Sequence, residues 1–297
     1  MTRTRLEIFE TQRPALTALC YRMLGEVGAA EDAVQDTWLR WADTDTDQIR
    51  NPAAWLRKTA TRVALDALRS ARARRETYVG PWLPEPLAPV DPGPDGADRF
   101  ALAQDCELAL LWAMERLTPP ERAALILRSA FDASYAEIAQ VLDRSDAACR
   151  QLVSRARKQV QSAGPRFDAP ADQVAALIAR FSAAMAAQDH AQALALMAPD
   201  AVWISDGGAR VRAARRPLVG PAEIIQVSAA VLAQAAPLGL IPQPMQVNGT
   251  AALALWQGAQ IHSLITLAPD PAGRIAWIYT LRNPDKLAQL TRSTMVA

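Results

Sequence analysis

The chain has 297 residues, of which 51% are hydrophobic and 21% charged, an ordinary globular composition that suggests about two domains. The formal net charge is +1, and residues 1–166 hold 23 basic and 23 acidic side chains. The chain therefore lacks the overall excess of basic residues that would by itself indicate nucleic-acid binding. Because phosphate groups are bound by local clusters of charge, binding has to be judged from clusters along the chain.

The cysteines and histidines are too few and too scattered for a disulfide framework or a metal cluster, and no cysteines form a CxxC pair. These residues are Cys20, Cys106, Cys149, His190 and His262. The N-terminal residues contain no apolar signal-peptide core, and no apolar run approaches the roughly 20 residues that span a bilayer. We therefore expect a soluble cytoplasmic protein with no metal, no other cofactor and no membrane segment.

Residues 5–76 are predicted to form a helical bundle. Apolar residues recur at helical spacing in the first helix, and Gly25 and Gly28 are expected to break the chain before a second one. That second helix, within AAEDAVQDTWLRWAD, carries a mainly acidic ridge at positions i, i+1, i+4 and i+5. The ridge consists of Glu31, Asp32, Gln35 and Asp36. It is either an ordinary solvated face or an interface for arginines of a partner protein.

A third helix is predicted to begin near Pro52, because proline is tolerated at an early helical position. Residues 51–75 carry seven basic side chains against the single acid Asp66, a density that suits the backbone of duplex and separated DNA strands. The candidates for DNA contact are Arg57, Lys58, Arg62, Arg69 and Arg72. Opening a duplex also needs aromatic surfaces for unstacked bases. The nearby candidates are Trp38, Trp41 and Trp55, although plain core packing is the role expected first for each of them.

Residues 77–98 are predicted to be an extended acidic linker. Between residues 80 and 98 the sequence has six prolines, four acidic residues and no basic one. Proline at this density excludes a helix or a central strand. As a bare sequence feature the segment is a spacer, and its charge suits a path along a positively charged channel.

Residues 99–163 are predicted to form a second helical domain with a helix-turn-helix between Ser134 and Lys158. Ser134 and Glu137 have the spacing of a capping box, and Asp143–Ser145 supplies a three-residue turn. The following helix is apolar on one side and offers hydrogen-bond donors on the other, as recognition in the major groove requires. Its candidates for DNA contact are Arg150, Gln151, Ser154 and Arg155, with Arg157 and Lys158 on phosphates. The alternative is a solvated amphipathic helix with a basic stripe, which the capped first helix and the short turn disfavour.

Residues 170–290 are predicted to form an α+β domain, with helices first and a curved antiparallel sheet after them. The strand-like runs are AVWIS, ARVRAARRPLV, LIPQPMQV, AALALWQ, QIHSLITLA and RIAWIYTL, and one more helix is expected at about 221–235. Two turns are also predicted, the first because paired glycines tolerate positive φ and the second before a last helix. Their residues are Asp206, Gly207 and Gly208, and Asn283, Pro284, Asp285 and Lys286.

Over residues 5–163 the chain resembles the bacterial extracytoplasmic-function sigma factors. RLTPPERAALILRSAFDASYAEIAQVLDRSDAACRQLVSRARKQV is similar to region 4 of that family, which recognises the −35 promoter element. AEDAVQDTWLRW resembles region 2.2, which binds the clamp helices of the RNA polymerase β′ subunit. NPAAWLRKTATRVALDALRSARARR resembles regions 2.3 and 2.4, which melt and recognise the −10 element. YVGPWLPEPL, SDGGARV and RNPDKL together resemble a subgroup whose SnoaL-like C-terminal domain takes the place of a separate anti-sigma protein.

The resemblance implies a multidomain protein with two all-α sigma domains, a region 2 helical bundle and a region 4 helix-turn-helix, followed by a cone-shaped α+β SnoaL-like domain. Its implied partners are promoter DNA and core RNA polymerase, bound through the β′ clamp helices and the β flap. The acidic ridge is then assigned to polymerase, the basic helix to the −10 element, and the linker to a path towards the RNA exit. Two departures stand out, since many members have Asn in place of Arg62, and the subgroup tends to have a third glycine and a lysine in place of Ala209–Arg210.

The C-terminal domain is expected to regulate and not to catalyse. Cone-shaped folds enclose an apolar pocket and many are enzymes, so function has to be argued from the site. Neither His190 nor His262 has a convincing dyad partner, so no catalytic residue is assigned and we expect regulation, or the sensing of a small-molecule ligand. The hypothesis is that the two predicted turns contact region 2 or the linker and set whether the sigma core binds polymerase.

Two alternatives compete with the sigma factor. One is a helix-turn-helix repressor with a ligand-binding domain that acts without polymerase, and the other is a SnoaL-like enzyme with a DNA-binding arm. The acidic ridge and the basic helix favour the sigma factor, because a simple repressor needs neither.

Overall fold

The computed structural model describes residues 4–45, 49–76, 78–88, 108–162 and 169–296, except for the side chains of residues 72–74, 76, 109 and 292–296. The described residues fall into two units. The first unit comprises those of Met1–Glu76 and Leu111–Ala163, and the second those of Thr77–Pro89, Glu107–Leu110 and Gly164–Ala297. The proline-rich residues 78–88 therefore belong to the same unit as the C-terminal domain.

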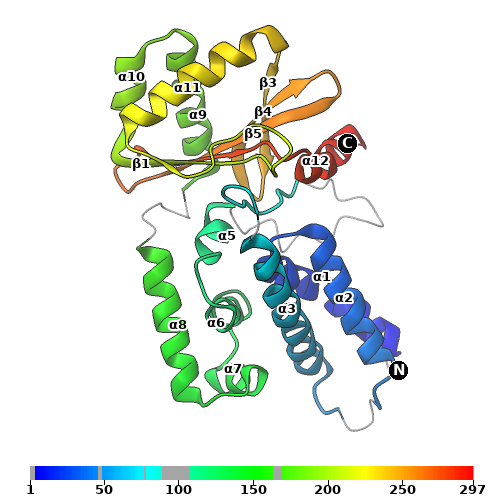
Figure 1. Cartoon of the computed structure of the whole chain (residues 1–297). Helices are drawn as coiled ribbons and strands as arrows, with labels where there is room; N and C mark the ends of the chain where they lie inside the picture. Colours follow the sequence, from blue (N-terminus) through cyan, green and yellow to red (C-terminus); the bar gives the residue numbers. More distant parts are fainter. Residues whose placement is uncertain (1–3, 46–48, 77, 89–107, 163–168, 297) are drawn as a thin grey trace. The chain divides into compact units, whose positions relative to one another are not determined.

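The first half of the first unit is a bundle of α1 (Arg5–Leu24), α2 (Val27–Ala42) and α3 (Pro52–Glu76), which pack on one another (Figure 1). Gly25 ends α1 in the left-handed region, at φ 70°, and its N–H donates to the Tyr21 carbonyl. The predicted break at Gly28 is wrong, because Gly28 lies inside the first turn of α2. A glycine in that turn costs only about 0.5–1 kcal/mol relative to alanine, which is too little to end a helix that packs on its neighbours.

The second half of the first unit consists of α6 (Pro119–Ala130), α7 (Tyr135–Leu142) and α8 (Asp146–Gln161), and α5 (Leu108–Met114) precedes them. The predicted capping box is confirmed, because the Ser134 hydroxyl accepts from the Glu137 N–H and the Glu137 carboxylate accepts from the Ser134 N–H. The apolar side of α8 is buried as expected, through Cys149, Leu152, Val153, Ala156 and Val160. Residues 99–107 of the predicted domain lie outside the described residues.

The second unit is built on a six-stranded sheet of order β2-β1-β6-β5-β4-β3. The strands are β1 (Met197–Asp206), β2 (Leu218–Val219), β3 (Ile241–Val247), β4 (Thr250–Gln257), β5 (Gln260–Pro269) and β6 (Ile275–Leu281). The expected all-antiparallel sheet is wrong in one place, because β1 pairs with β6 in parallel. A short hairpin forces two consecutive strands to run antiparallel. No hairpin joins β1 to β6, because β2, β3, β4 and β5 lie between them in the chain, so these two strands can pair in parallel.

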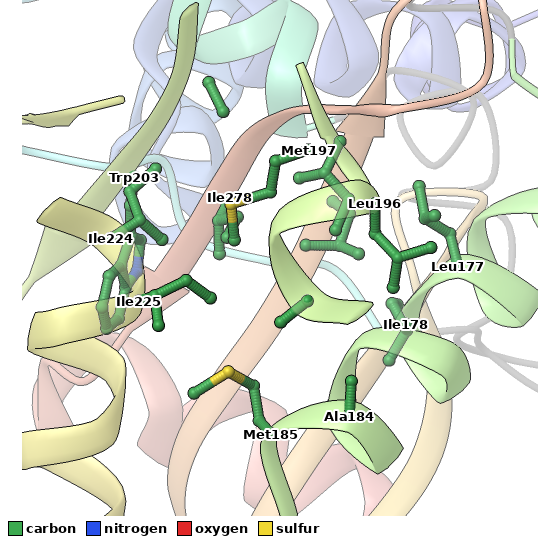
Figure 2. Close-up of a cluster of buried hydrophobic side chains, with 14 of the residues drawn as sticks. Leu177, Ile178, Ala184, Met185, Leu196, Met197, Trp203, Ile224, Ile225 and Ile278 are labelled. Carbon is green, nitrogen blue, oxygen red and sulfur yellow. The ribbon is translucent and has the colours of Figure 1, made fainter. Parts of the chain in front are cut away.

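Helices α9 (Ala171–Ala186), α10 (His190–Ala195) and α11 (Pro221–Ala235) lie over one face of the sheet, and α12 (Pro284–Val296) lies against β5 (Figure 1). A short 3₁₀ turn, η2 (Ala236–Leu238), follows α11. The side chains between the helices and the sheet form one apolar core, in which Met185, Trp203 and Ile225 meet from α9, β1 and α11 (Figure 2). Burying side chains of this size contributes about 1.5–3 kcal/mol each.

Two of the predicted strands have unusual compositions, one rich in proline and one rich in arginine. β3 forms although it contains Pro242 and Pro244, because it is an edge strand, where a missing amide donor costs least. The run ARVRAARRPLV is mostly not a strand, and only Leu218 and Val219 pair with β1. Its first residue, Ala209, has a left-handed φ of 58°, which ends the extended chain directly after β1.

Among the described residues, no helix combines the length and the apolar composition that a membrane crossing requires.

Candidate nucleic-acid interface and linker site

The turn between α7 and α8 sets the angle of the helix-turn-helix. Asp143 ends α7 in the left-handed region, at φ 54°, and its N–H donates to the Ala139 carbonyl. Two residues later the Ser145 hydroxyl accepts from the Ala148 N–H and begins α8. The three-residue turn predicted at Asp143–Ser145 therefore has both of its helix caps in place.

The candidate DNA-binding side of α8 is fully open to solvent, because all six predicted side chains are exposed. They are Arg150, Gln151, Ser154, Arg155, Arg157 and Lys158. Two of them also have neighbours on the helices beneath, since the Arg150 guanidinium lies 4.7 Å from the Tyr135 ring centre and Arg155 Nε lies 3.3 Å from Glu121 Oε1. The first contact places Arg150 over Tyr135 of α7, and the second directs Arg155 towards α6.

The basic side chains of α3 divide into two groups. Arg69 pairs with Asp66 on its own helix, at 2.9 Å, and is exposed. Arg62 instead donates to the carbonyls of Val141 (3.2 Å) and Gln140 (3.3 Å) at the C-terminal end of α7. Arg57 lies 4.0 Å from Glu137 in the first turn of α7, Lys58 is half-buried, and the side chain of Arg72 lies outside the described residues.

The three candidate tryptophans are not equivalent. Trp41 is fully buried and its indole N–H donates to the Arg5 carbonyl (3.0 Å), so it takes the core-packing role that was expected first for each of the three and has no surface left for stacking on bases. Trp55 packs against Trp41, with ring centres 5.3 Å apart, and Trp38 packs on Phe9 at 4.9 Å. Trp38 and Trp55 are half-buried and keep part of their surface exposed.

The four residues of the acidic ridge, Glu31, Asp32, Gln35 and Asp36, are all exposed on α2. Leu39 extends the ridge by one turn and is 56% exposed. Carboxylates beside an uncovered leucine are an arrangement suited to a protein partner that offers both arginines and an apolar side chain.

A buried ion cluster joins the two halves of the first unit. Arg122 on α6 is fully buried and donates from Nε to the Arg22 carbonyl at the end of α1, at 3.0 Å. Glu115 bridges two cations, with one carboxylate oxygen on Arg122 and the other 2.5 Å from Arg75 of α3. Since α1 and α3 belong to the first half and Arg122 to the second, the cluster holds helices of both halves together.

Burial by itself raises the pKa of Glu115, but the charges and hydrogen bonds of Arg122 and Arg75 outweigh it and leave that pKa below its ordinary value of 4.5. The carboxylate is therefore ionised at neutral pH and compensates the buried guanidinium groups. No sequence pattern predicts this cluster, because its members are far apart in the chain and none stands in a recognisable motif.

Asp206, from the first predicted turn, is the centre of a second buried site. Its carboxylate accepts from the Tyr78 hydroxyl (2.6 Å) and the Gly208 N–H (3.0 Å) on one oxygen, and from the Leu83 N–H (2.9 Å) and Lys286 Nζ (2.8 Å) on the other. Both Asp206 and Lys286 are buried. Four donors therefore satisfy this carboxylate, and two of them come from the proline-rich segment.

Lys286, from the second predicted turn, is enclosed by the same segment. Its ammonium lies 4.0 Å from the Trp82 ring centre and 5.5 Å from that of Tyr78, and it also donates to the Leu83 carbonyl. Burial raises the pKa of Tyr78, and so do the hydrogen bond and the charge of Asp206. The phenol is therefore a proton donor to Asp206 over the whole range of neutral pH.

The remaining residues of the two predicted turns shape this site. Asn283 donates from Nδ2 to the Tyr78 hydroxyl (2.9 Å). The turn predicted over Asn283–Lys286 is wrong beyond Asn283, because Pro284 begins α12 and the next two residues lie in its first turn, where proline is tolerated. Gly208 has φ 63°, and a Cβ there would lie 2.4 Å from the Asn283 side chain, so only glycine fits. Gly207 is equally restricted, because a Cβ would lie 2.4 Å from the Val211 carbonyl, whereas Asp285 is exposed and pairs with Arg210 at 3.2 Å.

A second attachment fixes the segment further along. The Leu87 N–H donates to Asn248 Oδ1 (2.8 Å), and the Asn248 N–H donates back to the Leu87 carbonyl (3.0 Å). Leu83 and Leu87 are buried as well. The prediction of a free spacer missed this packing, although Trp82, Leu83 and Leu87 among the prolines indicate it, because apolar side chains in a free spacer have nothing to cover them.

Leu83 and Pro84 close an apolar pocket over the sheet face opposite to the core. The other lining residues are Leu108, Leu264, Thr266, Tyr279 and Leu281, and the free space between them is about that of one water molecule. His262 lies elsewhere, with Nδ1 2.8 Å from the Ser263 hydroxyl and Nε2 3.4 Å from Arg282. Burial, and then the charge of Arg282, lower the pKa of His262. Within the described ranges no group of three acidic, histidine or cysteine side chains is placed to hold a metal.

Three family models match successive parts of the chain. A model described as Sigma-70 region 2 matches residues 8–74, and one described as Sigma-70, region 4 matches residues 107–160. A SnoaL-like domain model matches residues 178–289. The three matches follow the order of the helical bundle, the helix-turn-helix and the sheet.

Similarity to individual proteins extends over almost the whole chain. The protein named ECF RNA polymerase sigma factor SigJ from Mycobacterium tuberculosis is 36% identical over 287 residues, which is 94% of this chain and 91% of that protein. SigG from the same species, also named an ECF RNA polymerase sigma factor, is 33% identical over 219 residues, 65% of this chain and 59% of that one. The crystal structure of SigJ matches with a TM-score of 0.72 at 32% identity and covers 94% of this chain and 97% of its own.

Proposed function

Because the chain belongs to the extracytoplasmic-function RNA polymerase sigma factors, we propose that it brings core RNA polymerase to its promoters and that its SnoaL-like domain regulates this step in cis. The exposed side of α8 recognises the −35 element, and the basic side of α3 contacts the −10 element. The acidic ridge binds the β′ clamp helices, and region 4 binds the β flap. Two weak DNA-binding halves act together because a linker joins them.

The observation that carries the regulatory part is the hydrogen bonding of Asp206 and Lys286 to residues 78–83. These residues belong to the connection between region 2 and region 4. A domain that holds this connection restricts where the two regions can be placed on separate promoter elements. Releasing or holding the segment therefore changes the ability of the chain to initiate transcription.

The same geometry supports regulation over catalysis in the SnoaL-like domain. Asp206 and Lys286 form a buried ionisable pair, and linker atoms complete their hydrogen bonding. Neither group is placed to act on a substrate while the segment is bound. His262 has Ser263 and Arg282 as its neighbours and no carboxylate within hydrogen-bond distance among the described residues, so it lacks the partner of a general base.

A small-molecule ligand fits this scheme as a regulator that acts on the linker. The pocket under Leu83 and Pro84 is lined mostly by apolar side chains, so it suits an apolar molecule. Such a molecule has to displace Leu83 and Pro84 to gain volume. Its binding is then coupled to release of the segment by the difference in its affinity for the two states.

Run-off transcription with purified core polymerase tests the proposal. The full chain is expected to initiate on a subset of a promoter library, and Lys286→Met is expected to change the yield on the same subset. Initiation by neither chain would overturn the sigma assignment. Initiation with equal yields from both chains would overturn only the regulatory part.

A further inference from the structure

The loop between β1 and β2 concentrates the positive charge of the SnoaL-like domain. Residues 169–296 hold nine basic side chains, and four of them fall between positions 210 and 216. The loop contains no acidic residue, and all four arginines are exposed. They are Arg210, Arg212, Arg215 and Arg216. This loop is called the arginine loop below.

The backbone of the arginine loop is fixed although it forms no strand. The N–H groups of Arg210 and Val211 both donate to the Gly207 carbonyl, at 3.1 Å. Arg282, the residue directly after β6, donates to the Arg212 carbonyl. A Cβ on Gly80 would lie 3.5 Å from the Ala214 carbonyl, so the linker segment also packs against the loop. A loop held in this way has little backbone entropy left to lose when its side chains bind a partner.

Only part of the charge is compensated. Arg210 pairs with Asp285 at 3.2 Å and Arg216 with Glu223 at 2.5 Å. Within the part of the chain that the structure describes, Arg212 and Arg215 have no ion pair. Arg282 is half-buried and has no carboxylate there either, and its Nε is buried without a hydrogen-bond acceptor. Three guanidinium groups therefore lack an anion among the described residues, which is costly for the half-buried one.

We propose that the arginine loop, together with Arg282, binds the phosphate backbone of duplex DNA. Guanidinium groups donate two parallel hydrogen bonds to a phosphate, and several of them on one fixed loop offer donors to more than one phosphate of a strand. The partner is argued from the tether, because the loop shares a chain with the DNA-binding helices α3 and α8 and so meets DNA at high effective concentration. The inference goes beyond the proposed function and rests on it for the identity of the DNA.

The salt dependence of DNA binding tests this proposal. The affinity of the full chain for a random 40-bp duplex is measured by fluorescence anisotropy between about 25 and 200 mM salt. Each lost phosphate contact lowers the slope of log affinity against log salt by about 0.9. Arg212→Ala and Arg215→Ala are therefore each expected to lower the slope by about 0.9 and the double variant by about 1.8.

Arg180→Ala is the matched control, because Arg180 is equally exposed on α9 and lies outside the arginine loop. It is expected to keep the slope of the unmodified chain. The proposal is overturned if the loop variants have the same slope as the control. It is also overturned if the unmodified chain does not bind DNA at the lowest salt. Weaker binding to core polymerase with unchanged DNA slopes would also overturn it, since the loop would then bind an acidic protein surface.

The test separates this proposal from the sigma assignment. DNA binding by the arginine loop is measured without polymerase, whereas the sigma assignment depends on run-off transcription. Loss of one result leaves the other standing.

Discussion

The Lys286 ammonium lies 2.8 Å from the Asp206 carboxylate, and both side chains are buried. Two opposite charges in such a place are stable only when further hydrogen bonds satisfy them. Here those bonds come largely from Tyr78 and Leu83 of the linker segment. The ion pair and the bound segment are therefore thermodynamically coupled, and loss of either weakens the other.

Breaking this ion pair is expected to destabilise the second unit strongly. Lys286→Met leaves the buried Asp206 carboxylate without its cation, which should lower the free energy of unfolding by about 3–5 kcal/mol. The double variant Asp206→Asn/Lys286→Met should lose less than the sum of the two single losses, because it leaves no unpaired charge. Denaturant unfolding followed by tryptophan fluorescence measures all three. The exposed ion pair between Arg210 and Asp285 serves as the control. Arg210→Met, which breaks that pair, should change the free energy of unfolding by less than about 0.5 kcal/mol.

Removing the Tyr78 hydroxyl is expected to loosen the linker segment while the fold remains. Tyr78→Phe loses the 2.6 Å hydrogen bond to Asp206 and the one accepted from Asn283, at a cost of about 1.5–3 kcal/mol. Amide hydrogen exchange should then become faster at Leu83 and Leu87, whose N–H groups bind Asp206 and Asn248. Val79→Ala, at an exposed neighbour, should leave both rates unchanged. Equal rates in the Phe variant and the unmodified chain would count against the coupling.

The side chains of α8 are expected to divide by the kind of DNA contact they make. Arg150→Ala should lower discrimination at one base pair of the −35 element by about 1–3 kcal/mol, because an arginine fork distinguishes guanine. Arg157→Ala should weaken all sequences alike, because a phosphate contact carries no base information. Binding of holoenzyme to a library of single base-pair changes measures both. A uniform loss for Arg150→Ala would make it a phosphate contact instead.

The acidic ridge is expected to determine affinity for core polymerase. Reversal of charge by Asp36→Lys should weaken binding to core polymerase at least tenfold, since like charges meet at the interface. DNA sequence preference should stay the same. Asp172→Lys, an exposed reversal on α9, is the control for the change in net charge. Equal affinities of the two variants, measured by fluorescence titration, would show that the ridge is only a solvated face.

The Glu115 cluster is expected to make the first unit sensitive to acid. Because the pKa of Glu115 is lowered in the folded chain, its stabilising effect is complete above its ordinary value of 4.5 and is lost as the pH falls through the lowered value. Glu115→Gln should lower the free energy of unfolding by about 3–5 kcal/mol near neutral pH, with the difference from the unmodified chain shrinking as acid is added. Denaturant unfolding across that pH range measures the difference. A difference independent of pH would exclude ionised Glu115 as the cause.

Helices and their caps could be predicted from the sequence because the responsible residues are three or four positions apart. Ser134 with Glu137, and Ser145 before α8, are local signals, and the structure has both caps. The exposed side of α8 followed from the same periodicity, since the apolar residues fix which face is buried. The two wrong predictions at Gly28 and after Ala209 are local as well, because Gly28 fits the first turn of α2 and Ala209 has a left-handed φ that ends the extended chain.

The buried sites could not be predicted, because their partners are distant in sequence. Arg122 binds a carbonyl 100 positions away, and Asp206 binds Leu83 across 123 positions. Hydrogen bonds of this kind are set by how complete elements pack, and a single sequence contains no periodic signal for them. The prolines of residues 78–88 correctly excluded a helix, but an extended chain can be a free spacer or a bound strap, and composition does not distinguish the two.

The parallel pairing of β1 with β6 has a consequence for the order of events during synthesis. Before β6 and Lys286 have been made, β1 lacks its central neighbour and Asp206 lacks its cation. The ribosome adds about 5–20 residues per second, so roughly 6–25 s pass between completion of region 4 and the arrival of Lys286. Every new chain therefore has both sigma regions complete before Lys286 can bind the linker segment. During that interval the linker segment lacks its contacts with Lys286.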